Sequence, residues 1–284
     1  MNLVKSAKES KFQLPIYLLP FVAFGLNIIG DMIGGSIALT ICNQFGLSDI
    51  VTNQILLLSV GINALIIFFW IKVVECRSIS SIGLNPKTIK KESVYGIVIG
   101  LMTFTIILMI GWFLNVVSFQ SADYSIKNLL IVLSMLPFWI VQAGAEEVLT
   151  RGWVLPFICA KSNRYVGIII SSLLFVCLHL NNAGLNTMAI VNIFLIGILL
   201  SVYTLRSNSL WKAIFFHACW NFAQGSIFGL SVSGALASKP NLMNFVSQGN
   251  EWLSGGTFGI EASIITTIVL LVVIVGTLLL KKKK

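Results

Sequence analysis

Two consecutive glutamates and an arginine lie inside a long apolar stretch. The segment Glu146-Glu147-Val148-Leu149-Thr150-Arg151 has aromatic and aliphatic residues on both sides. A charged side chain at bilayer depth costs about 2.5–3.5 kcal/mol on insertion scales, so such groups are candidates for function. On a helix Glu147 and Arg151 are four residues apart and can pair, whereas Glu146 is rotated by about 100° from Glu147. Glu146 is therefore a candidate general base, and a structural salt bridge at a helix end is the alternative.

The chain has only two histidines, and each stands in a short pattern on an apolar stretch. Phe175 precedes His179 by one helical turn, and Asn221 follows His217 by one turn. Residues four apart share a helix face, so His217 and Asn221 can address one point in space. A lone histidine in a membrane more often makes a helix–helix hydrogen bond. Two histidines together with a buried glutamate pair favour a shared polar site.

Depth in the bilayer tests this grouping in part. Glu146 and His179 lie at equal sequence distances from the turn at 162–163. An antiparallel hairpin would therefore place them at about equal depth, with His179 at the end of a helix over Tyr165–Leu180. His217 follows Lys212 closely, which predicts a shallower position unless a proline bend shifts the earlier segment.

The remaining ionisable and thiol groups are less suited to chemistry. Asp31 is another acid in an apolar run, and we expect it to pack or to hydrogen-bond to a partner helix. Cys177 and Cys219 stand two positions from the histidines and should face away from them, so neither is expected to be a co-ligand. Five cysteines without a C-x-x-C pair indicate neither disulfides nor a thiolate metal cage.

Long apolar runs must position these groups. The chain is 57% hydrophobic and 10% charged, with a mean hydropathy of +0.93, unlike a soluble domain. A helix needs about 20 apolar residues to cross a bilayer. Seven runs qualify: Leu14–Cys42, Val51–Ile71, Ser93–Ala122, Asn128–Ala145, Tyr165–Leu205, Ala213–Ser238 and Ala262–Leu280. The turn-forming cluster at 181–186 divides the fifth run into two helices. The sequence therefore predicts an all-α, polytopic transmembrane bundle of about eight helices.

The distribution of basic residues predicts the orientation. Cytoplasmic loops near span ends retain Lys and Arg. With both termini in the cytoplasm, only Lys127 and Lys239 of the 19 Lys and Arg residues fall outside. This topology and anionic headgroups, to which Lys281–Lys284 would anchor the last helix, account for the net charge of +9. No nucleic-acid partner is predicted. The first run is too long for a signal-peptide core and is expected to be retained.

One integral membrane domain is expected, since no loop is long enough to hold a soluble module. We divide it into residues 1–125, with three membrane helices, and residues 126–284, with the polar groups above and the last helix. The oligomeric state stays open.

Three motifs in the second part resemble those of the CPBP family, which comprises CAAX proteases and bacteriocin-processing enzymes and is also called the Abi family. The E-E-x-x-x-R motif matches Glu146–Arg151, F-x-x-x-H matches Phe175–His179, and H-x-x-x-N/D matches His217–Asn221. The resemblance covers roughly Leu129 to Phe228. A weaker likeness lies at Gly255–Glu261. Each motif alone is weak, but the ordered triplet is specific.

The resemblance implies roles for these residues. Glu146 and His179 would activate a water, His217 and Asn221 would stabilise the oxyanion or help to bind a metal, and Glu147 and Arg151 would support the site. Peptide-bond hydrolysis needs such a base, water and hydrogen-bond donors. Glu146, His179 and His217 would also suit Zn²⁺, although no H-E-x-x-H helix is present. The cofactor expectation is therefore either none or zinc.

We therefore expect an intramembrane endopeptidase, of glutamate or metallo type, in a bacterial plasma membrane. Its substrate would be a peptide or a membrane protein in the lipid bilayer. A non-catalytic scaffold or regulator of the same fold is the first alternative. A transporter is the second, but no internal symmetry of Gly and Pro positions supports it.

Overall fold

Apolar helices form most of the structure. The computed structural model describes residues 2–235 and 241–280. Its α-helices are α1 (Leu3–Lys8), α2 (Leu19–Phe45), α3 (Asp49–Ser59), α4 (Gly61–Phe69), α5 (Ile89–Phe113), α6 (Ile126–Ser134), α7 (Leu136–Glu147), α8 (Leu155–Lys161), α9 (Arg164–Cys177), α10 (Thr187–Ser207), α11 (Trp211–Asn221), α12 (Glu251–Ser254) and α13 (Ile264–Leu279). Three π-helical segments extend α4, α7 and α11, at Trp70–Val74, Val148–Val154 and Phe222–Ile227. Short 3₁₀ turns occur at Ile79–Ile82, Gly256–Phe258 and Ile260–Ala262.

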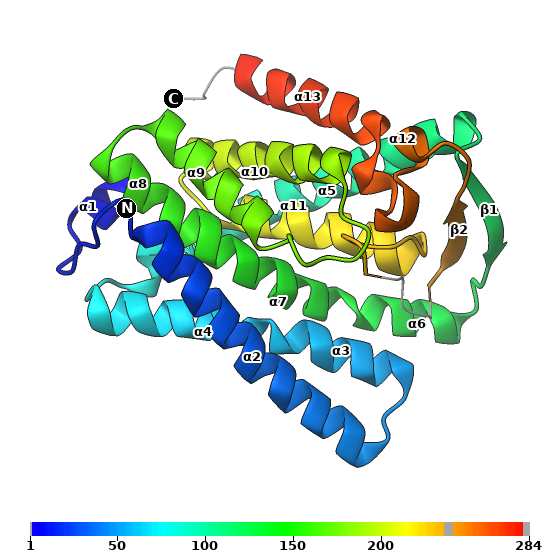
Figure 1. Ribbon diagram of the computed structural model, residues 1–284, viewed down its shortest axis with the longest axis horizontal. Helices are drawn as coiled ribbons and strands as arrows, with labels where there is room; N and C mark the ends of the chain where they lie inside the picture. Colours follow the sequence, from blue (N-terminus) through cyan, green and yellow to red (C-terminus); the bar gives the residue numbers. More distant parts are fainter. Residues whose placement is uncertain (1, 236–240, 281–284) are drawn as a thin grey trace.

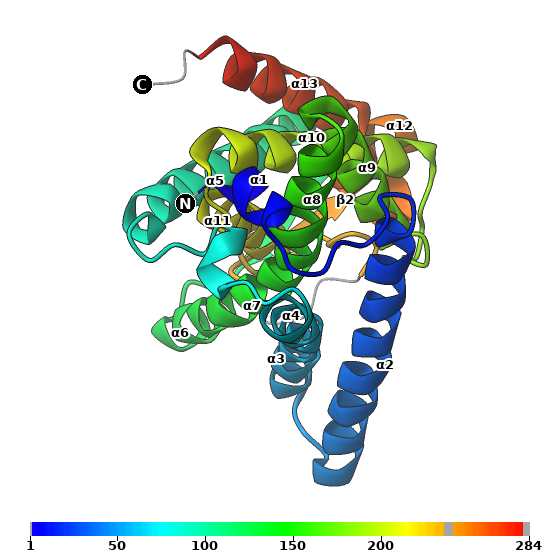
Figure 2. The same cartoon turned by 90° about the vertical axis from the view of Figure 1, so that its left-hand side faces the viewer.

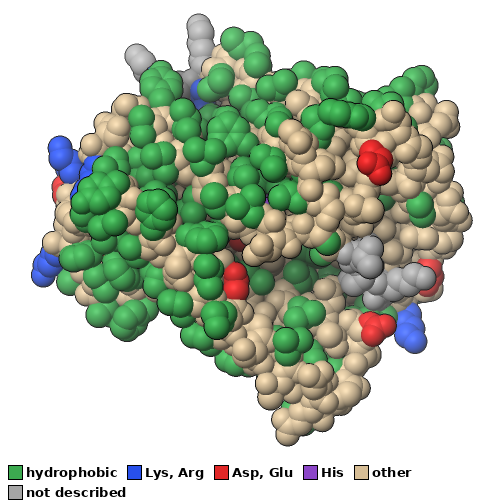
Figure 3. Space-filling view, in the orientation of Figure 1, with side chains coloured by type: hydrophobic (Ala, Val, Ile, Leu, Met, Phe, Trp, Pro, Cys, Tyr) green, Lys and Arg blue, Asp and Glu red, His purple; other side chains and the backbone are tan. Residues whose placement is uncertain are grey.

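The helices confirm the predicted all-α membrane bundle. Within the described residues, five helical segments are long and apolar enough to cross a membrane: Leu19–Phe45, Asp49–Val74, Ile89–Phe113, Ile126–Lys161 and Thr187–Ser207. Two shorter apolar helices, α9 and α13, accompany them. The helix α11 with its π-helical extension, residues 211–227, covers most of the remaining predicted run, whose residues 236–238 lie outside the described residues. Large apolar side chains cover much of the outer surface (Figure 3), as expected of a face in contact with lipid. The chain is a multi-pass membrane protein.

Two details of the predicted elements were wrong. The run ending at Ala122 is helical only to Phe113, because its last residues form the strand β1 (Val117–Ala122). β1 pairs antiparallel with β2 (Met243–Ser247) in a small two-stranded sheet. The helix predicted to end at Leu180 stops at Cys177, and His179 lies in the turn that follows. The predicted break at 181–186 is present, and α10 begins directly after it.

Helix α11 lies in the middle of the bundle, between α5, α7 and α10 (Figure 1). Glycines on α5 allow close packing. A Cβ at Gly100 would stand 2.5 Å from the backbone oxygen of Phe216, and one at Gly96 would stand 2.6 Å from that of Lys212. Small residues at such crossings let helix backbones approach each other in membranes. Since α5 falls in the range 1–125 and α11 in 126–284, this contact joins the two parts of the chain.

Helices α2, α3 and α4 form an outer layer against α7 (Figures 1 and 2). The Asp31 carboxylate on α2 accepts hydrogen bonds from Asn63 on α4 at 2.7 Å and from Asn27 on its own helix at 2.6 Å. The expected bond to a partner helix is therefore present. Asp31 is exposed on the surface of the protein.

Basic side chains gather at one end of the molecule, around α1 and α8, and one lysine stands at the opposite end (Figure 3). This agrees with the predicted charge asymmetry, whereas the side of the membrane that each end faces stays a prediction. Lys239 and Lys281 to Lys284, which also entered the topology prediction, lie outside the described residues.

Candidate active site

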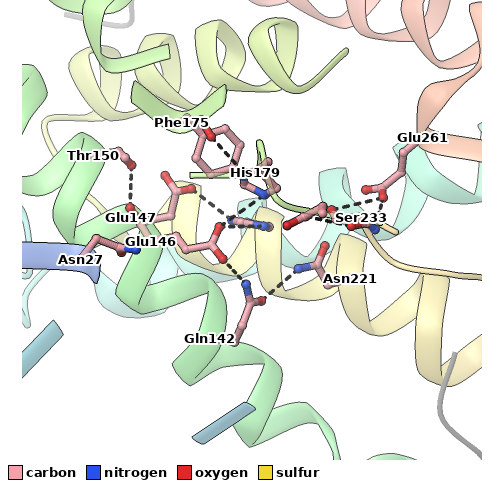
Figure 4. A network of polar contacts seen from close by, with 12 residues as sticks. Asn27, Gln142, Glu146, Glu147, Thr150, Phe175, His179, Asn221, Ser233 and Glu261 are labelled. Atoms are coloured by element: carbon pink, nitrogen blue, oxygen red, sulfur yellow. Dashed lines mark hydrogen bonds and ion pairs between the residues drawn. The ribbon is translucent and has the colours of Figure 1, made fainter. Parts of the chain in front are cut away.

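The four residues predicted to form one site line one cavity. Glu146 ends α7, His179 follows α9, and His217 and Asn221 lie on α11. All four side chains line a cavity of about 400 Å³ that is also bordered by α3 and by the loop 232–235. Figure 4 shows the labelled side chains converging from these elements, and Figure 3 shows the surface hollowed near the exposed face of α2.

The two histidines stand symmetrically about Glu146. The Nε2 atoms of His179 and His217 each lie 4.0 Å from Oε2 of Glu146. The sequence left two possibilities for His217, a shallower position or one level with Glu146, and the 4.0 Å distance supports the second. Helix α11 packs directly against α7, so the helices do not form the simple ladder on which the shallower position depended. Sequence distance from the loops then no longer measures depth.

Hydrogen bonds orient the Glu146 carboxylate. Its Oε1 atom accepts a hydrogen bond from Nε2 of Gln142, one turn earlier on α7. The Oε1 atom of Gln142 accepts in turn from Nδ2 of Asn221 at 3.0 Å. The other Glu146 oxygen, Oε2, is buried and makes no hydrogen bond within the described part of the chain. This chain of contacts holds Oε1 and leaves Oε2 facing the histidines.

The Nδ1 contacts select the protonation of both imidazole rings. Nδ1 of His179 lies 2.8 Å from the backbone oxygen of Phe175, and Nδ1 of His217 lies 3.1 Å from Oε1 of Glu147. Both partners are acceptors, so each Nδ1 carries a proton. In the neutral ring Nε2 is then an acceptor. Both rings therefore present Nε2 lone pairs towards Glu146, an arrangement that such Nδ1 contacts commonly fix at metal and catalytic sites.

Glu147 and Arg151 form a fully buried ion pair, as their spacing predicts. Nη1 of Arg151 lies 2.8 Å from Oε1 of Glu147, and both side chains are 0% exposed. The same guanidinium stands 4.1 Å from the centre of the Phe175 ring. That ring also contacts both imidazoles at its edges, with centroids 4.6 Å from His179 and 5.8 Å from His217. Phe175 thus packs between the ion pair and the histidines, which gives the aromatic position of its motif a physical role.

A π-helical segment begins inside the first motif, and another follows the third motif. One begins directly after Glu147 and the other directly after Asn221. In the first, the Thr150 hydroxyl donates to the backbone oxygen of Glu146 at 2.6 Å, and Arg151 donates to the same hydroxyl at 2.9 Å. Short π-helical segments within α-helices are frequent at functional sites. Here each segment begins directly after a polar residue of the candidate site.

Sequence reasoning missed several side chains beside the site. Gln142 could have been found, because it stands four residues before Glu146 on the same helix face. In the sequence, Glu261 stood out only as part of a weak family likeness. The structure shows that it is buried, with 6% of its surface exposed. It accepts hydrogen bonds from the Trp220 indole at 2.9 Å and from the Ser233 backbone at 2.6 Å. Glu261 thereby ties α11 to the loop that borders the cavity, and no local spacing signals such a contact.

The side chains of Glu146, His179 and His217 are of types that bind zinc, but the distances between them are longer than a zinc site requires. Within the residues that the structure describes, no three His, Cys, Asp or Glu side chains form a preformed metal cluster. Tetrahedral Zn²⁺ ligands at about 2.0–2.1 Å would stand roughly 3.3–3.4 Å apart. The observed 4.0 Å separations would therefore have to shorten by several tenths of an ångström. A water that hydrogen-bonds to two acceptors at about 2.8 Å would hold those acceptors roughly 4.6 Å apart or closer. The 4.0 Å distances from the histidine Nε2 atoms to Oε2 of Glu146 allow such a water. Cys177 is exposed, and neither it nor Cys219 lines the cavity.

Comparisons with known proteins agree with the motifs. Residues 128–223 match the family described as type II CAAX prenyl endopeptidase Rce1-like. A similar protein, an uncharacterized 24.3 kDa protein of Escherichia coli, is 34% identical over 98 residues. That match covers 34% of this chain and 43% of the relative. Residues 128–223, about a third of the chain, contain all three motifs and match the Rce1-like family, in agreement with the resemblance seen in the sequence.

Proposed function

We propose that this protein is an intramembrane endopeptidase that hydrolyses a peptide bond of a membrane-associated peptide or protein. The observation that carries the proposal is the Glu146 oxygen Oε2. It is buried in a bundle of apolar helices and faces two imidazole Nε2 atoms across a cavity. A buried carboxylate with an unused acceptor is suited to take a proton from water. The match of residues 128–223 to the type II CAAX prenyl endopeptidase Rce1-like family supports the same class of reaction.

In the proposed first step a water donates one hydrogen to Oε2 of Glu146 and the other to Nε2 of His179. Its oxygen lone pair then points away from both acceptors and towards the substrate carbonyl. As the oxygen attacks the carbonyl carbon, Glu146 takes the proton, and the carbonyl oxygen becomes an oxyanion. Gln142 holds the opposite carboxylate oxygen throughout, so Glu146 needs no reorientation for the transfer.

The proposed second step breaks the bond. Asn221 has a second amide hydrogen besides the one given to Gln142, and this hydrogen can be donated to the oxyanion. His217 can also donate from Nε2 when it is protonated, because the Glu147 carboxylate stabilises its positive charge. When the carbonyl re-forms, Glu146 returns its proton to the departing amine. The products are a carboxylic acid and an amine, and one water is consumed.

A metal ion would be held by Glu146, His179 and His217. Bound there, Zn²⁺ would act as a Lewis acid that lowers the pKa of a bound water and polarises the carbonyl. The Nδ1 contacts of both histidines suit this arrangement as well as the metal-free one. Prolonged chelation of purified protein, followed by metal analysis and addition of Zn²⁺, separates the two types of enzyme.

We further propose that the substrate reaches the site from the bilayer and that the protein resides in a bacterial plasma membrane. The cavity is bordered by Asn53 and Leu57 of α3 and by Trp139 of α7. This mixture of amide and apolar groups suits a peptide backbone with apolar side chains. We favour a peptide or membrane-protein substrate over a prenylated one.

Substrate trapping with Glu146→Gln tests the proposal. The substitution keeps the size of the side chain and one hydrogen-bond acceptor but removes the base. We expect normal membrane insertion and substrate binding, with cleavage lost, so uncleaved substrate should accumulate on the variant and be identifiable by mass spectrometry. The matched control is Glu9→Gln, at an exposed acid directly after α1 that pairs with Lys5. Normal cleavage of the trapped protein by Glu146→Gln, or normal cellular function in Glu146→Gln and His179→Ala cells, would refute the enzyme and favour a scaffold.

A further inference from the structure

A second polar cavity lies at the end of the bundle where α5 and α11 begin and α10 and α13 end. Its volume is about 260 Å³. That is below the usual range of sites for whole drug-sized ligands, about 300–1,000 Å³, and suits a smaller polar group. Four helices line it, and it shares no lining residue with the cavity around Glu146.

Three cations and one carboxylate line this cavity: Lys91, Arg206, Lys212 and Glu92. Three positive charges and one negative leave a net charge of +2 around a small space. Lys212 is only partly exposed. Its Nζ atom stands over two aromatic rings, 5.3 Å from the centre of the Tyr95 ring and 4.7 Å from that of Tyr203. The ammonium group is thus held in place by contacts from α5 and α10.

Retention of cytoplasmic charge alone does not account for this arrangement. A topology signal needs only Lys and Arg in water near a span end, whereas Lys212 is partly buried under two tyrosines. Lys91 and Lys212 also stand in the first turns of α5 and α11. A cation there is unfavourable, because it opposes the helix dipole. A bound anion would reverse this effect, since it would be attracted by the cations and by both helix N-termini.

The surroundings identify the kind of anion. The cavity lies where the candidate spans Ile89–Phe113 and Thr187–Ser207 reach one end of the bundle. Leu280 lines it, and the neighbouring Leu278 and Leu279 of α13 are 56% and 77% exposed. Phosphate oxygens would therefore face the cations while acyl chains lie along the leucines. Basic cavities between membrane helices bind lipid headgroups of this kind.

We propose that the cavity formed by Lys91, Arg206 and Lys212 binds the phosphate of an anionic phospholipid headgroup. A free phosphate ester has the same chemistry without the acyl chains, so the experiment compares both. Occupation of the site would join the ends of α5, α10, α11 and α13. Because α11 also presents His217 and Asn221, the lipid would stabilise the helix that supports the candidate active site.

The test uses the purified full-length chain in a neutral detergent. Thermal unfolding and native mass spectrometry are recorded with phosphatidylglycerol, with phosphatidylcholine and with glycerol 3-phosphate. We expect phosphatidylglycerol to bind and to raise the unfolding temperature, and the other two to bind much more weakly. In Arg206→Gln/Lys212→Gln the affinity for phosphatidylglycerol should fall roughly 30-fold, from about 1 kcal/mol per removed cation. The matched control is Lys8→Gln/Lys11→Gln, which removes the same charge at the same predicted membrane side but away from the cavity.

Each further outcome decides between the proposal and its alternatives. If the double variant unfolds without lipid, Lys212→Met replaces it, since its apolar chain can still pack between the two tyrosines. Equal affinity of this variant and wild type for phosphatidylglycerol would overturn the proposal. So would equal losses in the cavity variant and in the Lys8/Lys11 control, because the attraction would then be a general surface effect. Binding of glycerol 3-phosphate as tightly as phosphatidylglycerol would overturn the lipid assignment in favour of a soluble phosphate ester.

Discussion

Nδ1 of His217 lies 3.1 Å from Oε1 of Glu147, the same oxygen atom that pairs with Arg151 at 2.8 Å. One carboxylate oxygen therefore joins the first motif, on α7, to the third motif, on α11. Its negative charge is shared between a guanidinium and an imidazole, both almost fully buried. The pair thus supports the helix contact and the orientation of His217 at the same time.

Arg151→Ala should destabilise the protein and misorient His217. Removing one partner of a buried ion pair leaves an uncompensated charge and typically costs about 3–5 kcal/mol. Arg151→Lys should restore only part of this stability, because a compact ammonium lacks the planar contacts with Phe175 and Thr150. Thermal unfolding in detergent measures the effect. The control is Arg164→Ala, at an exposed arginine that donates a hydrogen bond to Tyr165. An Arg151→Ala protein as stable as wild type would show that Glu147 does not need this counter-charge.

Gln142→Leu should lower kcat with little change in KM. The substitution keeps the approximate volume but removes the group that joins Glu146 to Asn221. Loss of a hydrogen bond that orients an active-site group typically costs 10–100-fold. Cleavage of the substrate identified by trapping gives both constants. The control is Gln120→Leu, at an exposed position of β1. Unchanged kcat would mean that Glu146 is held by other contacts.

Glu261→Ala should affect substrate binding more than the chemical step. It leaves the buried Trp220 indole and the Ser233 backbone nitrogen without their acceptor, at about 1–3 kcal/mol for each unsatisfied group. The loop 232–235, which borders the cavity, should then shift and raise KM. Glu261→Gln keeps one acceptor oxygen, so its KM should rise less than that of Glu261→Ala. Kinetics and thermal unfolding are compared with Glu251→Ala, at the exposed start of α12. A fall in kcat alone would place Glu261 in the reaction itself.

The orientation in the membrane is testable by cysteine labelling. Lys87 and Lys127 lie at predicted cytoplasmic and outer positions, respectively, and both side chains are exposed. In a background lacking the five native cysteines, a membrane-impermeant maleimide should label Lys127→Cys in intact cells. Lys87→Cys should react only after the membrane is opened. Labelling of Lys87→Cys in intact cells would reverse the predicted topology.

Local patterns in the sequence predicted the helices and singled out the polar residues of the candidate site. A run of apolar residues must become a helix in lipid whatever its neighbours are, because only a helix satisfies its own backbone hydrogen bonds there. The ion pair of Glu147 and Arg151 follows equally from a spacing of four on one helix. The break between α9 and α10 follows from the turn-forming residues at 181–186. Each of these features depends on interactions within a few residues.

Contacts between distant segments were decided only by the tertiary structure. The position of His217 depends on how α7 packs beside α11, so counting residues from the loops could not decide its depth. Gln142 and Glu261 gain their partners Asn221, Trp220 and Ser233 across the fold. The pairing of β1 with β2 joins segments more than 100 residues apart. Such contacts are fixed by packing of whole helices, and this packing is encoded by no short pattern along the chain.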